Sequence, residues 1–220
     1  MIDQAGRVGK SFQAAAEVRQ GPAQTVSVCW PWVDATLWEL DNPHLYTCML
    51  KLAGEGIIED AFAQRFGFRE FKIDGRHFTL NGKRLRLRPW LMQEQAMTEL
   101  IDAEIDWVRS MGFNLAELWP WDHDQRGKYL SRRWIAQRAD EKGFLLTGVL
   151  PTVNNAVRNW QDPTEKRSWQ QRVGREWKHY RNHPSVLAWA ISGNYFGHHQ
   201  FDIRRAYLDG SKSLKVHADK

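Results

Sequence analysis

Residues 97–118, MTELIDAEIDWVRSMGFNLAEL, predict one helix followed by one short strand. Apolar side chains recur in the first part at spacings of four, four and three residues, at Met97, Ile101, Ile105 and Val108. This spacing places them in one stripe of a helix, which we expect to end near Gly112. The apolar run FNLAEL at 113–118 then has the length and composition of a buried strand. A helix that leads directly into a buried strand is typical of α/β folds.

The same alternation extends in both directions from this stretch. Strands are predicted at KRLRLR (83–88), FLLTGVL (144–150) and SVLAWAIS (185–192), and a second helix is predicted over 128–142. Asp162-Pro163-Thr164-Glu165 has the order of an N-cap, a proline at N1 and a carboxylate at N3, so a third helix should begin there. Its spacing predicts a buried stripe of Trp169, Val173, Trp177 and Tyr180.

Four strands that alternate with helices form either a small open sheet or half of a closed barrel. A (β/α)₈ barrel needs eight strands and about 250 residues. The first 75 residues differ, because TVSVCW (25–30), LYTCMLKL (45–52) and AFAQRFGFREFKI (61–73) alternate with the period of antiparallel strands. The sequence therefore predicts a β-rich domain over 1–75 and an α/β domain over 76–220.

Composition excludes several classes of protein. The net charge is +5, but the basic side chains are mixed with acidic ones in stretches that read as helices, so we expect solvated helix faces and no nucleic-acid partner. No apolar run approaches the roughly 18 residues of a membrane span. The two cysteines are too few for a disulfide framework or a zinc site. No signal peptide is visible, and the compartment and oligomeric state stay open.

Five segments, in order along the chain, resemble glycoside hydrolase family 2, the family of β-galactosidase, β-glucuronidase and β-mannosidase. They are LWELDNPHLYTCMLKL (37–52), FGFREFKIDGRHFTLNGKRLRLR (66–88), MGFNLAELWPW (111–121), ADEKGFLL (139–146) and RNHPSVLAWAISGN (181–194). The resemblance implies that 1–75 is the C-terminal part of an immunoglobulin-like β-sandwich. It implies that 76–220 is an α/β unit, a partial (β/α)₈ TIM barrel with strands 1–4. The chain would then be a fragment.

The resemblance also implies a function, the hydrolysis of O-glycosyl bonds to terminal β-linked sugars in a β-galactosidase-like manner. The partner would be a saccharide substrate, and no cofactor is implied. A retaining mechanism uses two carboxylates, one as acid/base and one as nucleophile. The family places its acid/base Glu directly after an Asn that corresponds to Asn194, but Tyr195 stands there, and the family's nucleophile corresponds to a position beyond Lys220.

Tyr195 does not replace a carboxylate, because a phenol with a pKa of about 10 is a poor base near neutral pH. Three alternatives stay open. Glu117, after the second strand, supplies the acid; Tyr195 acts in an altered mechanism; or the protein is a non-catalytic carbohydrate-binding module or pseudoenzyme, with Tyr195 as an aromatic wall.

Four more residues are candidates for sugar binding. Asn194 could hydrogen-bond a sugar hydroxyl or be a turn residue. Trp119 and Trp121 could stack on a sugar ring or pack their own loop. Arg88, which the sequence places at the end of the first barrel strand, could pair with a site carboxylate or be a surface side chain. His198, His199 and Asp202 invite a metal site, but adjacent histidines rarely share an ion, so no metal is expected.

Overall fold

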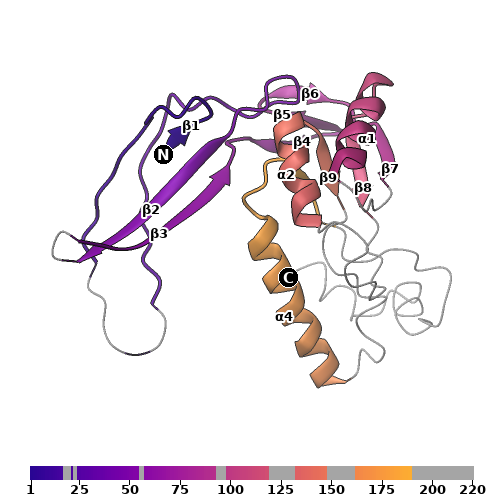
Figure 1. Ribbon diagram of the computed structural model, residues 1–220. Coiled ribbons are helices and arrows are strands. Elements are labelled where there is room, and N and C mark those ends of the chain that lie inside the picture. The colour runs from indigo at the N-terminus through magenta and orange to yellow at the C-terminus, as the bar shows by residue number, and fades with distance from the viewer. Residues whose placement is uncertain are drawn as a thin grey trace.

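The structure, a computed structural model, describes residues 1–16, 21, 24–54, 57–92, 98–118, 132–147 and 162–189. The described strands form three sheets: β1-β2-β3, β4-β5-β6 and a four-stranded sheet in the order β10-β9-β8-β7 (Figure 1). The first two sheets are antiparallel and the third is parallel. A β-rich N-terminal part and an α/β part are therefore confirmed.

The first sheet is dominated by a long hairpin that projects from the rest of the molecule (Figure 1). Its strands are β2 (Tyr46–Gly54) and β3 (Ile57–Phe66), with β1 (Ile2–Asp3) against β2. The predicted strand at 25–30 is wrong: Val26 and Val28 lie in irregular backbone and are more than half exposed. Alternation makes a strand only where a neighbour completes the ladder, and no described strand pairs with this segment.

The second sheet is a meander of β4 (Phe71–Asp74), β5 (His77–Leu80) and β6 (Lys83–Leu85). The expected domain boundary after residue 75 falls in the tight turn between β4 and β5, which pair with each other. The predicted barrel strand at 83–88 is wrong, because its first half is β6, antiparallel to β5. The first parallel strand is β7 (Pro89–Met92), an edge strand of the described sheet, where a proline at the first position breaks no ladder.

The remaining elements alternate as predicted. They are α1 (Thr98–Ser110), β8 (Leu115–Leu118), α2 (Arg132–Lys142), β9 (Leu145–Thr147), α4 (Pro163–Tyr180) and β10 (Val186–Ala188). The start of α4 is confirmed, because the Asp162 carboxylate accepts a 2.7 Å hydrogen bond from the Thr164 N–H. Its buried stripe is only partly correct, since Tyr180 is buried but Trp177 is 42% exposed. No helix in the described ranges is long and apolar enough to cross a membrane.

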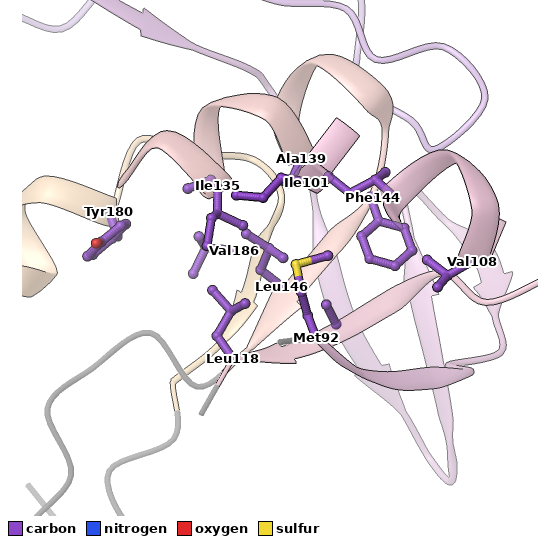
Figure 2. Packing of buried hydrophobic residues seen from close by; sticks show 13 residues of the cluster. Met92, Ile101, Val108, Leu118, Ile135, Ala139, Phe144, Leu146, Tyr180 and Val186 are labelled. Atoms are coloured by element: carbon purple, nitrogen blue, oxygen red, sulfur yellow. The ribbon is translucent and has the colours of Figure 1, made fainter. Parts of the chain in front are cut away.

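The main core lies between the parallel sheet and the helices α1 and α2 (Figure 2). Ile101, Ile105 and Val108 of the predicted stripe are fully buried, as are Ile135 and Phe144. Each such side chain contributes about 1.5–3 kcal/mol through removal of its surface from water. From the sheet, the cluster receives Met92, Ala116, Leu118, Leu146 and Val186. These residues define the helix-covered face of the sheet.

A second core covers part of the opposite face of the parallel sheet. Trp38 is fully buried there with Leu45, Leu80, Leu115 and Leu145. Trp38 comes from the loop before β2, and its indole N–H donates a 2.8 Å hydrogen bond to the Asp140 carbonyl in α2. The N-terminal segment thus packs directly against the base of the parallel sheet.

The turn after α2 lies against this same loop. Gly143 has a φ of +64°, and a Cβ added there would lie only 2.0 Å from the Leu40 carbonyl oxygen. That oxygen also accepts a 3.2 Å hydrogen bond from the Arg109 guanidinium. Glycine is required here both for its backbone conformation and for the close approach.

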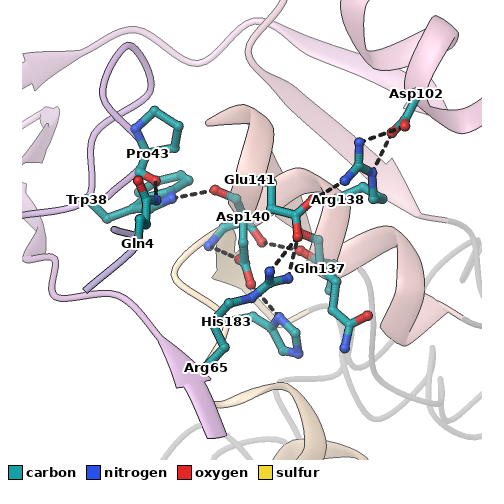
Figure 3. A network of polar contacts seen from close by, with 12 residues as sticks. Gln4, Trp38, Pro43, Arg65, Asp102, Gln137, Arg138, Asp140, Glu141 and His183 are labelled. Atoms are coloured by element: carbon teal, nitrogen blue, oxygen red, sulfur yellow. Dashed lines mark hydrogen bonds and ion pairs between the residues drawn. The ribbon is translucent and has the colours of Figure 1, made fainter. Parts of the chain in front are cut away.

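A chain of ion pairs joins the hairpin to both helices (Figure 3). Arg65 of β3 pairs with Glu141 of α2, and Glu141 also pairs with Arg138 one turn earlier. Arg138 reaches α1 with two 2.7 Å hydrogen bonds to the Asp102 carboxylate. These hydrogen bonds hold the pKa of Asp102 below its usual value and raise that of Arg138.

Candidate active site

Glu117 lies on the face of the parallel sheet opposite to α1 and α2. Side chains alternate along a strand, and Ala116 and Leu118 enter the core beneath the helices. Leu115 points the other way, into the cluster around Trp38, and Glu117 therefore points to the same side as Leu115. Leu115 is buried by that cluster, whereas Glu117 is exposed. On this face, the amino half of β8 is thus covered by the cluster around Trp38, whereas the Glu117 side chain is exposed.

The register of the sheet gives Glu117 its neighbours. Leu91 of β7 pairs with Glu117, and Glu117 pairs with Thr147 of β9. Leu91 is 47% exposed and Thr147 is half-buried, so an apolar side chain and a hydroxyl flank the carboxylate. No described residue forms an ion pair or a hydrogen bond with the Glu117 side chain. Among the described residues, none competes with a ligand's hydroxyl groups for the oxygens of this carboxylate.

Arg88 lies at the other end of the sheet. Its N–H donates a 2.8 Å hydrogen bond to the Asn114 side chain, and its carbonyl accepts one of 3.1 Å from the Asn114 N–H. Arg88 directly precedes β7, three residues before Leu91, which is about 10 Å along a strand. The prediction that Arg88 ends a barrel strand is therefore wrong in its placement, and the structure does not bring it to Glu117.

The other candidates lie outside the described residues. They are the predicted sugar-binding residues Asn194, Trp119 and Trp121, the possible acid Tyr195, and the histidines weighed for a metal. Within the described ranges, no group of three or more His, Cys, Asp or Glu side chains could hold a metal ion, and Cys29 and Cys48 are free thiols. The description of the candidate site thus rests on Glu117 and its neighbours.

Sequence reasoning missed a buried polar network at the start of β10 (Figure 3). The Asp140 carboxylate lies 2.6 Å from the His183 Nδ1 and accepts a 3.0 Å hydrogen bond from the Ser185 N–H. The Ser185 hydroxyl donates to the Ala136 carbonyl, so the three side chains do not form a Ser-His-Asp catalytic relay. The signal was present in RNHPSV (181–186), where polar residues lie next to a buried strand.

Arg69 completes this network from the segment that links β3 to β4. Its guanidinium donates to the Pro184 carbonyl at 2.6 Å and to the Val186 carbonyl at 2.5 Å. Burial lowers the pKa of Arg69, and the charge of Asp140 opposes that shift. The network fixes the turn that leads into β10, which precedes the candidate residues after 189.

Three comparisons with known proteins agree on the family that this chain resembles. Residues 2–69 match the family model of glycosyl hydrolases family 2. A putative β-glucuronidase of Formosa agariphila is 28% identical over 171 residues, which cover 73% of this chain and 19% of that protein. The chain thus spans about a fifth of the length of this curated relative.

Solved structures agree with the family match. The β-glucuronidase of Parabacteroides merdae aligns with a TM-score of 0.53 and 26% identity, over 81% of this chain and 23% of that one. The β-glucuronidase of Ruminococcus gnavus, solved with D-glucuronic acid, aligns with a TM-score of 0.58 and 20% identity, over 81% and 30% of the two chains, and shows the fold. The resemblance to glycoside hydrolase family 2 is confirmed, and this chain is similar to a part of such a protein.

Proposed function

We propose that this chain is part of a glycoside hydrolase that cleaves O-glycosyl bonds to terminal β-linked sugars. The observation that carries the proposal is the exposed carboxylate of Glu117, which no other described residue pairs with, on the face of the parallel sheet opposite to α1 and α2, in a chain similar to family 2 proteins. Carboxylates are the groups that glycosidases use as acid, base and nucleophile.

The proposed architecture is a sandwich fragment over 1–75 and the first four strands of a TIM barrel over 76–220. In such a barrel, consecutive parallel strands are neighbours and the helices lie outside them. The order β10-β9-β8-β7, with α1 and α2 packed on one face, supports this proposal. Active sites of these barrels lie at the carboxyl ends of the strands, and Glu117 is the third residue of the four in β8.

The substrate class follows from the relatives. The sequence favoured a β-galactosidase-like activity, but the relatives named above are β-glucuronidases. We therefore place a β-glucuronide first among the substrates to test and keep β-galactosides second. Both are β-linked sugars. They differ in the group on C5, a carboxylate or a hydroxymethyl group, and in the orientation of the 4-hydroxyl group.

The proposed mechanism is retaining. A second carboxylate would act as nucleophile, and Glu117 would protonate the leaving oxygen in place of the family's acid/base Glu, at whose position in the sequence Tyr195 stands. Asn194 would hydrogen-bond a sugar hydroxyl, and Trp119 and Trp121 would stack on the sugar. Arg88, at the far end of β7, has no part in this arrangement.

The test is to express the chain within its full reading frame and assay 4-nitrophenyl β-glucuronide, β-galactoside and β-mannoside. Glu117→Gln should lower kcat about 100-fold or more, the usual share of general acid catalysis. Glu99→Gln, which alters an exposed carboxylate on α1, is the matched control and should have no effect. Proton NMR of the first product anomer tests retention. Sugar binding without turnover would replace the proposal by the non-catalytic alternative. If the protein neither bound nor hydrolysed any of these sugars, both hypotheses would be refuted.

A further inference from the structure

Pairing with β9 alone does not fix the position of β10 in the parallel sheet. The strand is only three residues long, and its pairing with β9 is irregular. Val186 lies opposite Leu146. Ala188, two residues further on, lies opposite Thr147, which directly follows Leu146 in the chain. Such a bulge disrupts the ladder that would otherwise set the register, so other contacts must determine how far β10 extends along the sheet.

The guanidinium of Arg69 supplies such a contact from the side of β10 that faces away from β9. The Ser185 carbonyl faces β9, where it accepts a 2.8 Å hydrogen bond from the Leu146 N–H. Successive carbonyl groups of a strand point in opposite directions, so those of Pro184 and Val186 face away from β9. Arg69 donates to both carbonyls, at 2.6 and 2.5 Å. A planar guanidinium that bridges two carbonyls of one strand fixes that strand along its own axis.

The segment that carries Arg69 is itself held in place. The carbonyl of the preceding residue, Phe68, accepts a 2.7 Å hydrogen bond from the N–H of the fully buried Trp38. One residue earlier, Gly67 lies so close to Pro184 that an added Cβ would be only 2.8 Å from the Cγ of the proline ring. Arg69 therefore reaches β10 from a segment that is packed against the same turn and tied to the second core.

Asp140 of α2 holds the turn before β10 from another direction (Figure 3). Its side chain is buried, as are those of His183 and Ser185. One carboxylate oxygen lies 2.6 Å from the His183 Nδ1, and the other accepts a 3.0 Å hydrogen bond from the Ser185 N–H. An ionised carboxylate only accepts hydrogen bonds, so the His183 Nδ1–H donates to it. These contacts join buried groups of this chain and do not depend on an exposed surface.

We propose that Arg69 and the Asp140–His183 pair are positioning residues that fix β10 relative to the carboxylate of Glu117. Only β9 separates β10 from β8, which carries Glu117, and the active sites of (β/α)₈ barrels lie at the carboxyl ends of the strands. A displacement of β10 along its axis would therefore change the geometry of the site. A misplacement of about 1 Å can lower a rate about 100-fold. The role in a reaction rests on the proposed function, whereas the anchoring of β10 does not.

The kinetic test uses the protein expressed within its full reading frame, with 4-nitrophenyl β-glucuronide as substrate. Arg69→Ala should lower kcat and kcat/KM equally, by about 10- to 100-fold, in protein that circular dichroism shows to be folded. Arg65→Ala is the matched control, because Arg65 also joins the N-terminal part to the α/β part, but through Glu141 and the Gln137 carbonyl of α2. This control should leave kcat nearly unchanged.

Conservative variants and hydrogen exchange add two further measurements. The amide of His183→Asn can donate in place of the Nδ1–H, so this variant should keep most of the kcat that His183→Ala loses. Arg69→Lys keeps the charge but not the planar pair of donors, so it should lose activity, and it replaces Arg69→Ala if that variant does not fold. Hydrogen-exchange mass spectrometry needs no substrate, and the peptide over 183–188 should exchange about tenfold faster in Arg69→Ala than in Arg65→Ala.

Four outcomes would contradict the reasoning. A lower unfolding temperature of Arg69→Ala with unchanged kcat would make Arg69 a purely structural residue. An equal loss of kcat in Arg65→Ala would mean that any break between the two parts has the same effect. Unchanged exchange over 183–188 would refute the anchoring of β10 by Arg69. Absence of turnover by the unaltered protein would refute the proposed function and any role in its reaction, and the exchange measurement would still decide whether Arg69 anchors β10.

Discussion

Gly143→Ala is the sharpest structural test, because two separable costs meet at this residue. Any L-residue pays about 1–2 kcal/mol for the left-handed backbone that Gly143 adopts at a φ of +64°. The added Cβ would also lie 2.0 Å from the oxygen and 2.7 Å from the carbon of the Leu40 carbonyl, so the backbone must move. Displacements of this kind in packed regions cost about 1–3 kcal/mol.

Gly112→Ala isolates the first of these costs. Gly112 lies in the turn after α1 with a φ of +90°, and a Cβ there would meet nothing within 4 Å. We expect Gly112→Ala to lose only the backbone cost of about 1–2 kcal/mol, and Gly143→Ala to lose about 2–5 kcal/mol. Urea unfolding followed by far-UV circular dichroism measures both free energies of unfolding. Equal losses in the two variants would refute the close packing of the α2–β9 turn against the loop at Leu40.

Three other predictions concern the core, acid stability and catalysis. Trp38→Ala should lower the free energy of unfolding by about 3–5 kcal/mol, because it empties the second core and removes the indole hydrogen bond to Asp140. Thermal unfolding measures this loss, and a loss below about 1 kcal/mol would contradict the packing. Arg138→Ala should raise the pKa of Asp102 toward its usual value, as read by carboxyl-carbon NMR. Since the pKa of Asp102 is depressed in the folded state, the Asp102–Arg138 pair stabilises the fold at pH values above the unfolded pKa of about 4, and this stabilisation is lost as the pH falls through the folded pKa. An unchanged titration of Asp102 in the variant would refute the pairing. Glu117→Gln should abolish most turnover of the complete protein with little change in its unfolding temperature, and unchanged kcat would remove Glu117 from the mechanism.

The helices and the parallel strands β8, β9 and β10 were predictable because their signals are local. The stripe of Ile101, Ile105 and Val108 and the N-cap at Asp162 depend on residues within a few turns, and both are present in the structure. The predicted helix over 128–142 begins at Arg132 within the described residues, and its end at Lys142 was read correctly from the glycine that follows.

The failures came from partners that are distant in the sequence. KRLRLR alternates equally well as a barrel strand or as the last strand of a meander, and only its pairing with β5 decides between them. That decision also moved Arg88 from the carboxyl end of a strand to the amino end of the next. Likewise, the strand pattern around Val26 lacks a described neighbour, and the Asp140–His183 contact joins residues 43 positions apart. Local periodicity carries no information about such partners.

The fully buried Trp38 has a consequence for how this fold can be divided or recombined. The loop that carries it seals the base of the parallel sheet over Leu115 and Leu145, and Leu80 of the meander helps it. A cut at residue 75 would strip that seal and leave both leucines facing water. Any transfer of the parallel sheet into another protein must therefore carry the loop around Trp38 and the meander with it. In gene fusion or domain shuffling, the N-terminal β-rich part and the parallel sheet should therefore be transferred together.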